Sequence, residues 1–242
     1  MSRRLSVVIP CKNDLDGLRT TWQALAPVRE MLEIALVDGG STDGLSDALL
    51  AGEFDADHIC IGEDTGIYDA MNRGWARTSA PWVWFVGTGD VPDVAGIERV
   101  FAAGDATDSL QVFRVDLLPP REVGVPDHYP ARWDRSLVWR HTAHHQGVVY
   151  PRKHMPSPPF DPRRAVLADY ELHLGLYLNG LGAVVHSERI CAVRSGGASR
   201  KFNAGLYREE WRIKRGKLRG PELWCQPIWL AGKYAFKRLQ RR

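Results

Sequence analysis

Two stretches near the N-terminus decide the fold class: LSVVIP at residues 5–10 and EIALVDGGSTDG at residues 33–44. Each contains a short and mostly apolar run, LSVVI at 5–9 and IALV at 34–37, which is typical of a parallel strand buried on both faces. Between them, apolar residues recur with helical spacing over residues 14–25. A strand, a helix and a second strand in this order predict a right-handed βαβ unit and a parallel sheet.

The alternation continues along the chain. The sequence predicts further strands at residues 58–61, 82–86, 110–117, 145–150 and 183–186, and helices at residues 45–50, 67–76, 94–103 and 166–178. We therefore expect an α/β fold with a Rossmann-like, mostly parallel sheet and helices on both faces.

Polar residues follow each of the first four predicted strands. They lie at residues 11–14, 38–43 and 63–65 and at Asp90. Each cluster by itself is explained more simply by helix caps and turns, for which Asp, Ser, Thr and Gly are common. Because the carboxyl ends of parallel strands meet at one edge of a sheet, four such clusters in succession favour a ligand site there.

The composition excludes several classes of protein. Of the 242 residues, 44% are hydrophobic and 25% are charged, which excludes a disordered or fibrous chain. No apolar run approaches the ~20 residues needed to span a bilayer. The four cysteines form no CxxC pair, so neither a zinc cluster nor a disulfide framework is indicated. We therefore expect a cytoplasmic protein.

Common nucleotide and hydrolase motifs are absent. No G-x-G-x-x-G follows the first predicted strand, and the chain has no phosphate loop, no G-x-S-x-G and no H-E-x-x-H. A nucleotide would have to be bound in another way. The acidic strand ends predict a divalent metal that bridges carboxylate and phosphate oxygens.

Several short motifs, in order, resemble the family 2 glycosyltransferases of GT-A fold: SVVIP at residues 6–10, VDGGSTDG at 37–44, EDTGIYDAMNRG at 63–74 and FVGTGD at 85–90. HQ at 145–146, ADYEL at 168–172 and GGAS at 196–199 extend the match. The form of the third motif resembles bacterial enzymes of exopolysaccharide, colanic-acid-type and O-antigen assembly. The resemblance implies a GT-A domain over residues 1–200, with a nucleotide-sugar half (1–93) and an acceptor half (94–200), followed by a tail at 201–242.

The resemblance also implies which residues bind the donor. They are Pro10, Cys11, Asn13, Asp38, Asp64, Asp69, Asn72, Arg73 and Gly89. Asp38 would hydrogen-bond the base beside Pro10 and Cys11, and Arg73 would pair with a phosphate oxygen, which suits a guanidinium. A UDP-sugar is the favoured donor, ahead of a GDP- or dTDP-sugar.

Two further carboxylates match the family's metal ligand and catalytic base. Asp90 matches the second carboxylate of the D-x-D motif, whereas Thr88 stands where the first is expected. The resemblance therefore implies Mn or Mg held by Asp90 and the diphosphate. Asp169 matches the base of inverting members, which removes the proton of the acceptor hydroxyl as it attacks the anomeric carbon. The simpler alternative for Asp169 is a helix cap.

Residues of the second half are expected to contact sugars. The resemblance assigns His145, Gln146, Tyr170 and Glu171 to the acceptor or the donor sugar. On a helix, His141, His144 and His145 would cluster as a zinc site, but the strand-like sequence that follows disfavours that alternative. Gly196, Gly197, Ser199 and Arg200 form either a lid over the donor or a plain linker.

The tail differs in charge from the rest of the chain. Residues 200–242 contain thirteen basic and three acidic side chains, against nineteen and twenty-six in the first 199 residues. This asymmetry predicts an anionic partner. Basic segments with tryptophan are typical of the membrane interface. A helix packed on the body is the alternative, and nucleic acid is disfavoured because no recognisable module is present.

Together these observations predict an inverting, metal-dependent glycosyltransferase. It would transfer a sugar from a nucleotide-diphosphate sugar to a saccharide or lipid-linked saccharide in cell-surface polysaccharide or glycolipid synthesis, at the inner face of the membrane. A sugar nucleotidyltransferase is disfavoured, since residues 11–14 lack its Gly-rich basic loop. A catalytically silent nucleotide-sugar-binding or membrane-scaffold subunit stays open as an alternative, because of Thr88.

Overall fold

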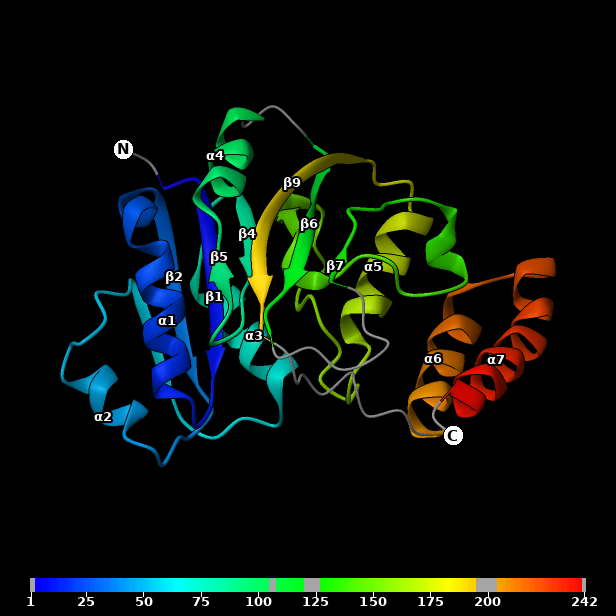
Figure 1. Cartoon of the computed structure of the whole chain (residues 1–242), viewed down its shortest axis with the longest axis horizontal. Coiled ribbons are helices and arrows are strands. Elements are labelled where there is room, and N and C mark those ends of the chain that lie inside the picture. Colours follow the sequence, from blue (N-terminus) through cyan, green and yellow to red (C-terminus); the bar gives the residue numbers. More distant parts are fainter. Residues whose placement is uncertain (1–2, 105–107, 120–126, 195–203, 241–242) are drawn as a thin grey trace.

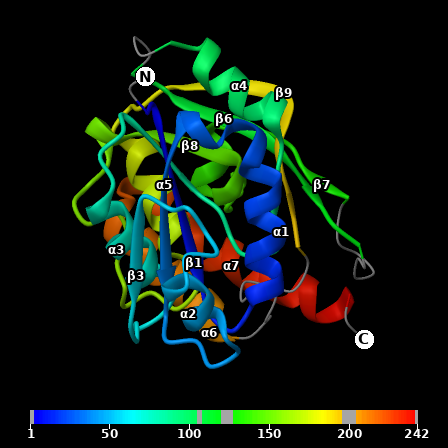
Figure 2. The same cartoon turned by 90° about the vertical axis from the view of Figure 1, so that its left-hand side faces the viewer.

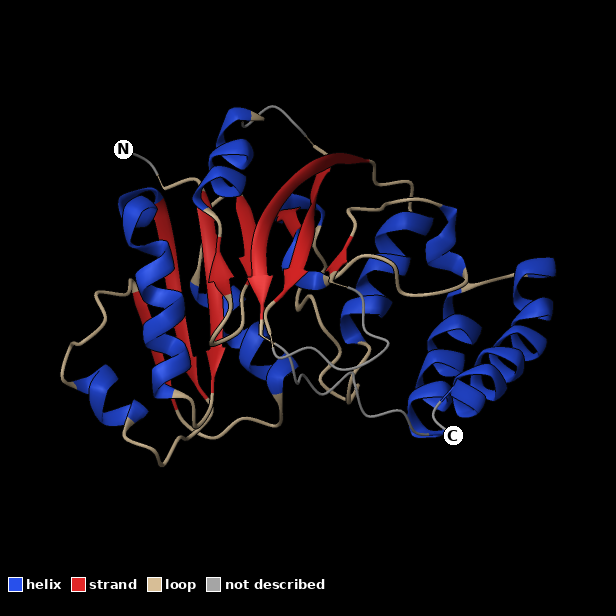
Figure 3. Ribbon diagram, in the orientation of Figure 1, coloured by secondary structure: helices blue, strands red, loops and turns tan. Residues whose placement is uncertain are grey.

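The computed structural model describes residues 3–104, 108–119, 127–194 and 204–240, and for residues 239 and 240 it describes the backbone alone. A central sheet carries helices on both of its faces, and two C-terminal helices lie at one end of the molecule (Figures 1 and 3). The residues predicted as a lid or linker (Gly196, Gly197, Ser199 and Arg200) lie outside the described residues.

Among the described residues, the sheet has nine strands. They are β1 (Leu5–Cys11), β2 (Leu32–Asp38), β3 (His58–Ile61), β4 (Trp82–Phe85), β5 (Val91–Pro92), β6 (Leu110–Leu117), β7 (His128–Tyr129), β8 (Val148–Pro151) and β9 (Ala183–Val193). Their spatial order is β3-β2-β1-β4-β8-β6-β9-β5, with β7 beside β6. The strands β1 to β4 pair in parallel as predicted, whereas β8 runs antiparallel to both of its neighbours and makes the sheet mixed.

Helices cover both faces of the sheet, because successive side chains of a strand point to opposite faces and both faces are apolar. The helices are α1 (Leu15–Leu25), α2 (Leu45–Leu50), α3 (Ile67–Arg77), α4 (Val94–Ala102), α5 (Ala168–Leu178), α6 (Ala204–Lys217) and α7 (Gly220–Gln240). In β1, Val7 and Ile9 face a core shared with α1 and α4, and Val8 faces the core shared with α3 and α5. Figure 2 shows the sheet between these two layers.

Close packing positions α3 against the sheet. A Cβ on Gly74 would lie 2.4 Å from Cγ1 of Val8, so only glycine allows the helix to approach β1 this closely. This approach fixes the N-terminal turn of α3, and with it Tyr68, near the carboxyl ends of the strands.

Two strands differ from the sequence-based expectation. The strand predicted at residues 145–150 begins only at Val148, because His145–Gly147 form a short 3₁₀ turn, η3. The strand predicted at 183–186 continues to Val193 as β9. Both differences matter for the site, since the turn carries His145 and Gln146, and the extension brings Arg194 to Asp90.

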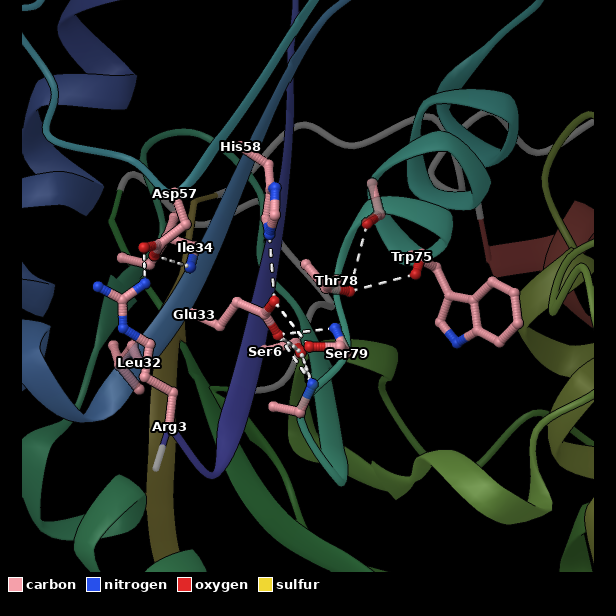
Figure 4. Close-up of polar contacts among 12 residues, drawn as sticks. Arg3, Ser6, Leu32, Glu33, Ile34, Asp57, His58, Trp75, Thr78 and Ser79 are labelled. Carbon is pink, nitrogen blue, oxygen red and sulfur yellow. Dashed lines mark hydrogen bonds and ion pairs between the residues drawn. The ribbon is translucent and has the colours of Figure 1, made fainter. Parts of the chain in front are cut away.

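A buried polar cluster closes the amino ends of the strands (Figure 4). Glu33 accepts hydrogen bonds from Ser6 Oγ at 2.7 Å and from the N–H groups of Ser79 and Ala80 at 2.8 Å each. His58 Nε2 lies 3.1 Å from its other oxygen. Burial raises the pKa of Glu33, but these hydrogen bonds outweigh it and lower the pKa to about 2. We call this set of residues the Glu33 cluster.

Candidate functional site

The loops that follow β1 and β2 interlock at the carboxyl edge of the sheet. The N–H of Asn13 donates to Ser41 Oγ at 2.8 Å, and the N–H of Thr42 donates to Asn13 Oδ1 at 2.7 Å. Asn13 has a φ of 51°, in the left-handed region that asparagine tolerates better than most residues. Asn13, predicted to bind the donor, therefore shapes the loop that would face a nucleotide.

Asp38, predicted to hydrogen-bond the base, is fully buried at the end of β2. Its carboxylate accepts hydrogen bonds from the hydroxyl groups of Ser41 and Ser46, and the N–H of Ser41 adds another at 3.1 Å. Asp38 thus orders the loop after β2 in this structure. Its contact with a base stays a prediction, and it would require one serine to turn away.

Pro10 and Cys11, predicted beside the base, are both buried in β1. The Cys11 thiol donates to Val37 O at 3.3 Å and packs in the core under α1. Burial raises the pKa of this thiol to about 12, so it stays protonated. Strand alternation directs the Cys11 side chain into the core, and the prediction that it lines a base pocket does not fit this structure.

Asp64 and Asp69 lie between the end of β3 and the first turn of α3. A Cβ on Gly39 would lie 2.2 Å from Asp64 Oδ2, so the loops after β2 and β3 meet here closely. Asp64 accepts from the N–H of Gly66 at 3.0 Å, and Asp69 accepts from the N–H of Thr65 at 3.1 Å. Both aspartates are partly exposed, as a contact with ribose or diphosphate would require.

Arg73 and Asn72, the last predicted donor residues of this segment, have different surroundings. Arg73 Nη1 donates to Gly62 O at 2.9 Å, which keeps its guanidinium beside the loop after β3. Asn72 donates to Phe160 O at 2.8 Å and accepts from the N–H of Phe160 at 3.0 Å. Since both ends of its amide are occupied, Asn72 fastens α3 to a neighbouring loop, and the prediction of donor binding does not fit it.

Asp90, the predicted metal ligand, is buried just after β4. Its Oδ2 accepts from the N–H of Gly87 at 2.8 Å and from Gln146 Nε2 at 3.2 Å, and its Oδ1 accepts from the N–H of Arg194 at 3.0 Å. Burial raises the pKa of this carboxyl group above its ordinary value, and these donors only partly offset the effect. A cation beside Asp90 would favour the ionised form.

The surroundings of Asp90 fit a hard divalent cation. Gln146 Oε1 is buried and meets no donor at hydrogen-bonding geometry among the described residues. Carboxylate and amide oxygens are ligands that Mg²⁺ and Mn²⁺ prefer. Within the same part of the chain, no three His, Cys, Asp or Glu side chains are placed to hold a metal ion. An ion at Asp90 would therefore take further ligands from the diphosphate of the donor, as the resemblance implies.

Asp169, the predicted base, lies in the first turn of α5 and is largely buried. His145 Nδ1 lies 3.3 Å and His141 Nε2 lies 3.9 Å from its Oδ2. The Tyr68 hydroxyl donates to Val166 O, and its oxygen also lies 3.3 Å from Oδ1 of Asp169. His145 and Gln146 are neighbours in η3. The dipeptide His145–Gln146 therefore contacts Asp169 through His145 and Asp90 through Gln146.

Opposing effects act on the charge of Asp169. Burial raises its pKa, but the imidazoles of His141 and His145 lower it more, so the pKa lies well below its ordinary value. The N-terminus of α5 also favours a negative charge in this turn. Asp169 is therefore ionised at neutral pH and able to accept a proton.

The histidines considered as a zinc site point in different directions, although the rings of His144 and His145 stack with 5.5 Å between their centroids. His141 and His145 face Asp169, whereas the ring of His144 stacks on Tyr129 with 5.0 Å between the centroids. His141 also meets the buried His173, with 3.1 Å between Nε2 and Nδ1. In the described part of the chain these histidines form no metal cluster.

The sequence did not reveal two residues of this site, Arg194 and Tyr68. The Arg194 guanidinium pairs with Asp14 and packs on Gly89, where a Cβ would lie 2.5 Å from Arg194 Nε. Gly89 also has a φ of 79°, so both its backbone and the space around it require glycine. Tyr68 lies within the motif at residues 63–74, but in the sequence it is typical of an aromatic residue of the core. No motif or spacing connects Arg194 with Asp90.

The structure directs Tyr170, predicted to contact a sugar, away from the site. Tyr170 is fully buried, donates to Leu137 O at 2.9 Å and packs against α6. One step along an α-helix turns a side chain by about 100°, which directs Tyr170 away from the face that carries Asp169. Glu171 forms a two-bond ion pair with Arg164 at 2.6 and 3.0 Å, and its sugar contact stays a prediction.

Comparison with known proteins identifies the family. The model of Glycosyl transferase family 2 matches residues 6–116. A PGL/p-HBAD biosynthesis glycosyltransferase from Mycobacterium bovis is 30% identical over 189 residues, which cover 72% of this chain and 70% of that relative. The chain belongs to glycosyltransferase family 2. The subgroup of exopolysaccharide and O-antigen enzymes stays a prediction.

Solved structures similar to this family 2 glycosyltransferase share its fold. The TM-score is 0.68 with S. aureus TarS 1–349 in complex with UDP-GlcNAc, at 15% identity over 87% of this chain and 65% of that one. It is 0.63 with the mannosyltransferase PcManGT from Pyrobaculum calidifontis in complex with GDP-Man and Mn²⁺, at 17% identity over 96% and 69% of the two chains. The predicted GT-A fold is confirmed.

Proposed function

We propose that this glycosyltransferase is an inverting enzyme that uses a nucleotide-diphosphate sugar and a saccharide or lipid-linked saccharide acceptor. The observation that carries the proposal is the link between two buried carboxylates, in which His145 meets Asp169 and Gln146 meets Asp90. A base and a diphosphate-binding group must act on the same sugar from different sides. His145 contacts the proposed base, Asp169, and Gln146 contacts Asp90, the proposed ligand of the metal at the diphosphate.

The donor half of the proposal places the diphosphate near Asp90 and Arg194. Arg194 presents a half-exposed guanidinium at the ends of β1 and β4, and Arg73 lies beside the loop after β3. A divalent ion held by Asp90 and Gln146 Oε1 would neutralise negative charge on the leaving diphosphate. The bound UDP-GlcNAc and GDP-Man of the two similar structures support a nucleotide-sugar donor.

The chemical step assigns the proton to Asp169. The acceptor oxygen forms a bond to the anomeric carbon while the bond from that carbon to the diphosphate oxygen breaks, and its electron pair leaves with the nucleoside diphosphate. Asp169 takes the proton of the acceptor hydroxyl, for which an ionised carboxylate is required. His145 orients this carboxylate. A single displacement inverts the configuration at the anomeric carbon.

The acceptor is assigned by class only. The Mycobacterium bovis relative is a glycosyltransferase of PGL/p-HBAD biosynthesis, which supports a biosynthetic role for this chain. A saccharide or lipid-linked saccharide of the cell surface is the proposed acceptor class.

A catalytically silent binding or scaffold subunit is the second candidate. Thr88 replaces the first carboxylate of the metal motif, and no cluster of three metal-binding side chains exists among the described residues. Such a subunit would bind the donor yet show no turnover that depends on Asp169.

A panel of nucleotide sugars tests the proposal. In the presence of Mn²⁺, at least one UDP-, GDP- or dTDP-sugar should raise the unfolding temperature of the protein and be slowly hydrolysed by it. Asp169→Asn should abolish the hydrolysis but keep the thermal shift. Absence of binding by every sugar nucleotide would falsify the enzyme proposal, and binding with no hydrolysis in the wild type would favour the silent subunit.

A further inference from the structure

An uncharged apolar stripe runs along the exposed side of α7. Trp224, Ile228 and Phe236 are 74%, 81% and 62% exposed, and Trp229 is 43% exposed. At about 100° per residue, these side chains and the small residues between them cover nearly half of the circumference of the helix. Single exposed apolar residues are normal, but a continuous stripe marks an interaction surface.

Buried polar contacts fix which face of α7 is exposed. Lys214 of α6 is fully buried, and its Nζ donates to Gln226 Oε1 of α7 at 2.9 Å and to Trp139 O at 2.7 Å. Gln226 in turn donates to Val138 O at 3.2 Å. Since these contacts tie α7 to both α6 and the body, the apolar stripe cannot turn inward without breaking them. Figure 1 shows α7 at the end of the molecule, away from the sheet.

The surface of this helical pair is positively charged. All three acidic residues of the pair are engaged: Glu209 accepts from the N–H groups of Val166 and Leu167, Glu210 pairs with Lys214 and Lys233, and Glu222 pairs with Arg135. The exposed basic residues are Arg208, Arg212, Arg215, Arg219, Lys237 and Arg238. The first three recur at intervals of four and three and therefore share one face of α6.

We propose that the apolar stripe of α7 docks on a bilayer surface that contains anionic lipid. Tryptophan prefers the headgroup region, and basic residues near it are attracted to anionic lipids. In the described part of the chain no helix is both long and apolar enough to cross a membrane, so the helix would lie in the plane of the surface. The proposal rests on the surface of the α6–α7 pair alone and does not depend on the proposed reaction.

Binding of the full-length protein to vesicles tests this surface. The protein should cosediment with vesicles of phosphatidylcholine containing 30% phosphatidylglycerol, and at least tenfold more weakly with phosphatidylcholine alone. The double variant Trp224→Glu/Ile228→Glu should bind the anionic vesicles at least tenfold more weakly, as should Arg208→Glu/Arg212→Glu/Arg215→Glu. Leu50→Glu is the matched control, because Leu50 is 76% exposed on α2, far from this surface, and it should bind like the wild type.

A second readout needs no substitution. Cys225 is the exposed cysteine of this chain, next to Trp224, and the other three are buried. An environment-sensitive fluorophore on Cys225 should shift to the blue on addition of the anionic vesicles. Equal vesicle binding by the wild type and the α7 double variant, or no shift at Cys225, overturns the proposal. So does a wild-type dimer in lipid-free buffer that the double variant converts to a monomer in sedimentation velocity, because the stripe then joins two copies of the chain.

Discussion

Two polar clusters with buried carboxylates lie at opposite ends of the strands in this family 2 glycosyltransferase, and their hydrogen bonding differs. In the Glu33 cluster the carboxylate meets hydroxyl, imidazole and backbone N–H groups, and its pKa is lowered to about 2. At the carboxyl ends, Asp90 has a raised pKa, and the adjacent Gln146 Oε1 is buried with no hydrogen-bond donor at good geometry in the part of the chain that the structure describes.

We expect this difference to separate a structural cluster from the proposed ligand site. Full hydrogen bonding of a buried carboxylate stabilises the folded state and leaves nothing for a ligand to satisfy. A buried oxygen without a partner beside a carboxylate of raised pKa is unfavourable until a cation or donor arrives. Four substitutions, in order of decreasing expected effect, test whether the two clusters have these separate roles.

The largest effect is expected at Asp169. Asp169→Asn removes the proton acceptor but keeps the shape of the side chain, so turnover should fall about 100- to 10,000-fold. Donor affinity should change little, whereas the unfolding temperature should fall, because the ionised form of a carboxyl group with a lowered pKa stabilises the folded state. Steady-state kinetics and thermal unfolding of the same preparation measure both. Retention of more than a tenth of the wild-type turnover would remove Asp169 from the chemical step.

Substitution of Glu33 should change the stability of the fold and leave the binding of the donor unchanged. Its pKa lies below the ordinary value of 4.5, so the charged form stabilises the fold above pH 4.5, and this stabilisation is lost as the pH falls towards 2. Glu33→Gln should lower the free energy of unfolding at pH 7 by on the order of 3 kcal/mol and leave donor affinity unchanged.

Urea unfolding from pH 6 to pH 3 checks the sign of this effect. The difference in stability between the wild type and Glu33→Gln should shrink as the pH falls below 4.5, because Glu33 becomes protonated in the unfolded state while it stays ionised in the folded state down to about pH 2. A constant difference across this range would mean that packing, not charge, is what Glu33 contributes.

A smaller effect is expected at Gln146. Gln146→Leu removes one donor to Asp90 and the unpaired amide oxygen, so donor affinity in Mn²⁺ should fall about tenfold, or ~1.4 kcal/mol. Titration calorimetry with and without Mn²⁺ measures this change. Gln111→Leu is a matched control, since Gln111 is also fully buried but lies on β6 beside His186. Equal losses for the two variants would indicate a general packing defect.

The smallest effect is expected at Arg194. Arg194→Lys keeps the charge but loses the planar guanidinium that packs on Gly89, so donor affinity should fall about threefold. Arg99→Lys serves as the control, because Arg99 is exposed on α4 and pairs with Glu188 away from the strand ends. A loss with UDP alone, in the absence of the sugar, would place Arg194 at the diphosphate.

Much of the fold could be predicted from the sequence, because its signals are local. The apolar runs at residues 5–9 and 33–37 and the helical spacing at 14–25 lie within β1, β2 and α1 or one residue outside them. Asp90 and Asp169 were found through short motifs, and both lie in the cluster that His145 and Gln146 join. The predicted division of the chain at residue 200 and the roles of the donor residues stay predictions.

Some predicted contacts did not fit because side-chain direction is set by the tertiary structure. Tyr170 and Cys11 stand next to polar positions in the sequence, yet helix rotation and strand alternation turn both into a core. Asn72 belongs to a donor-binding motif, but its amide is occupied by Phe160, which is distant in sequence.

The sequence by itself determined the order of strands and helices, the family and the two principal carboxylates, because periodicity and short motifs are properties of neighbouring residues. Only the tertiary structure decided which distant groups surround them. Arg194 reaches Asp90 because β9 continues to Val193, and Gln146 reaches it because η3 precedes β8. The uneven charge of the tail is visible in the sequence. Its separation into an arginine face on α6 and an apolar stripe on α7 follows from the packing around Lys214, which selects the faces that meet water.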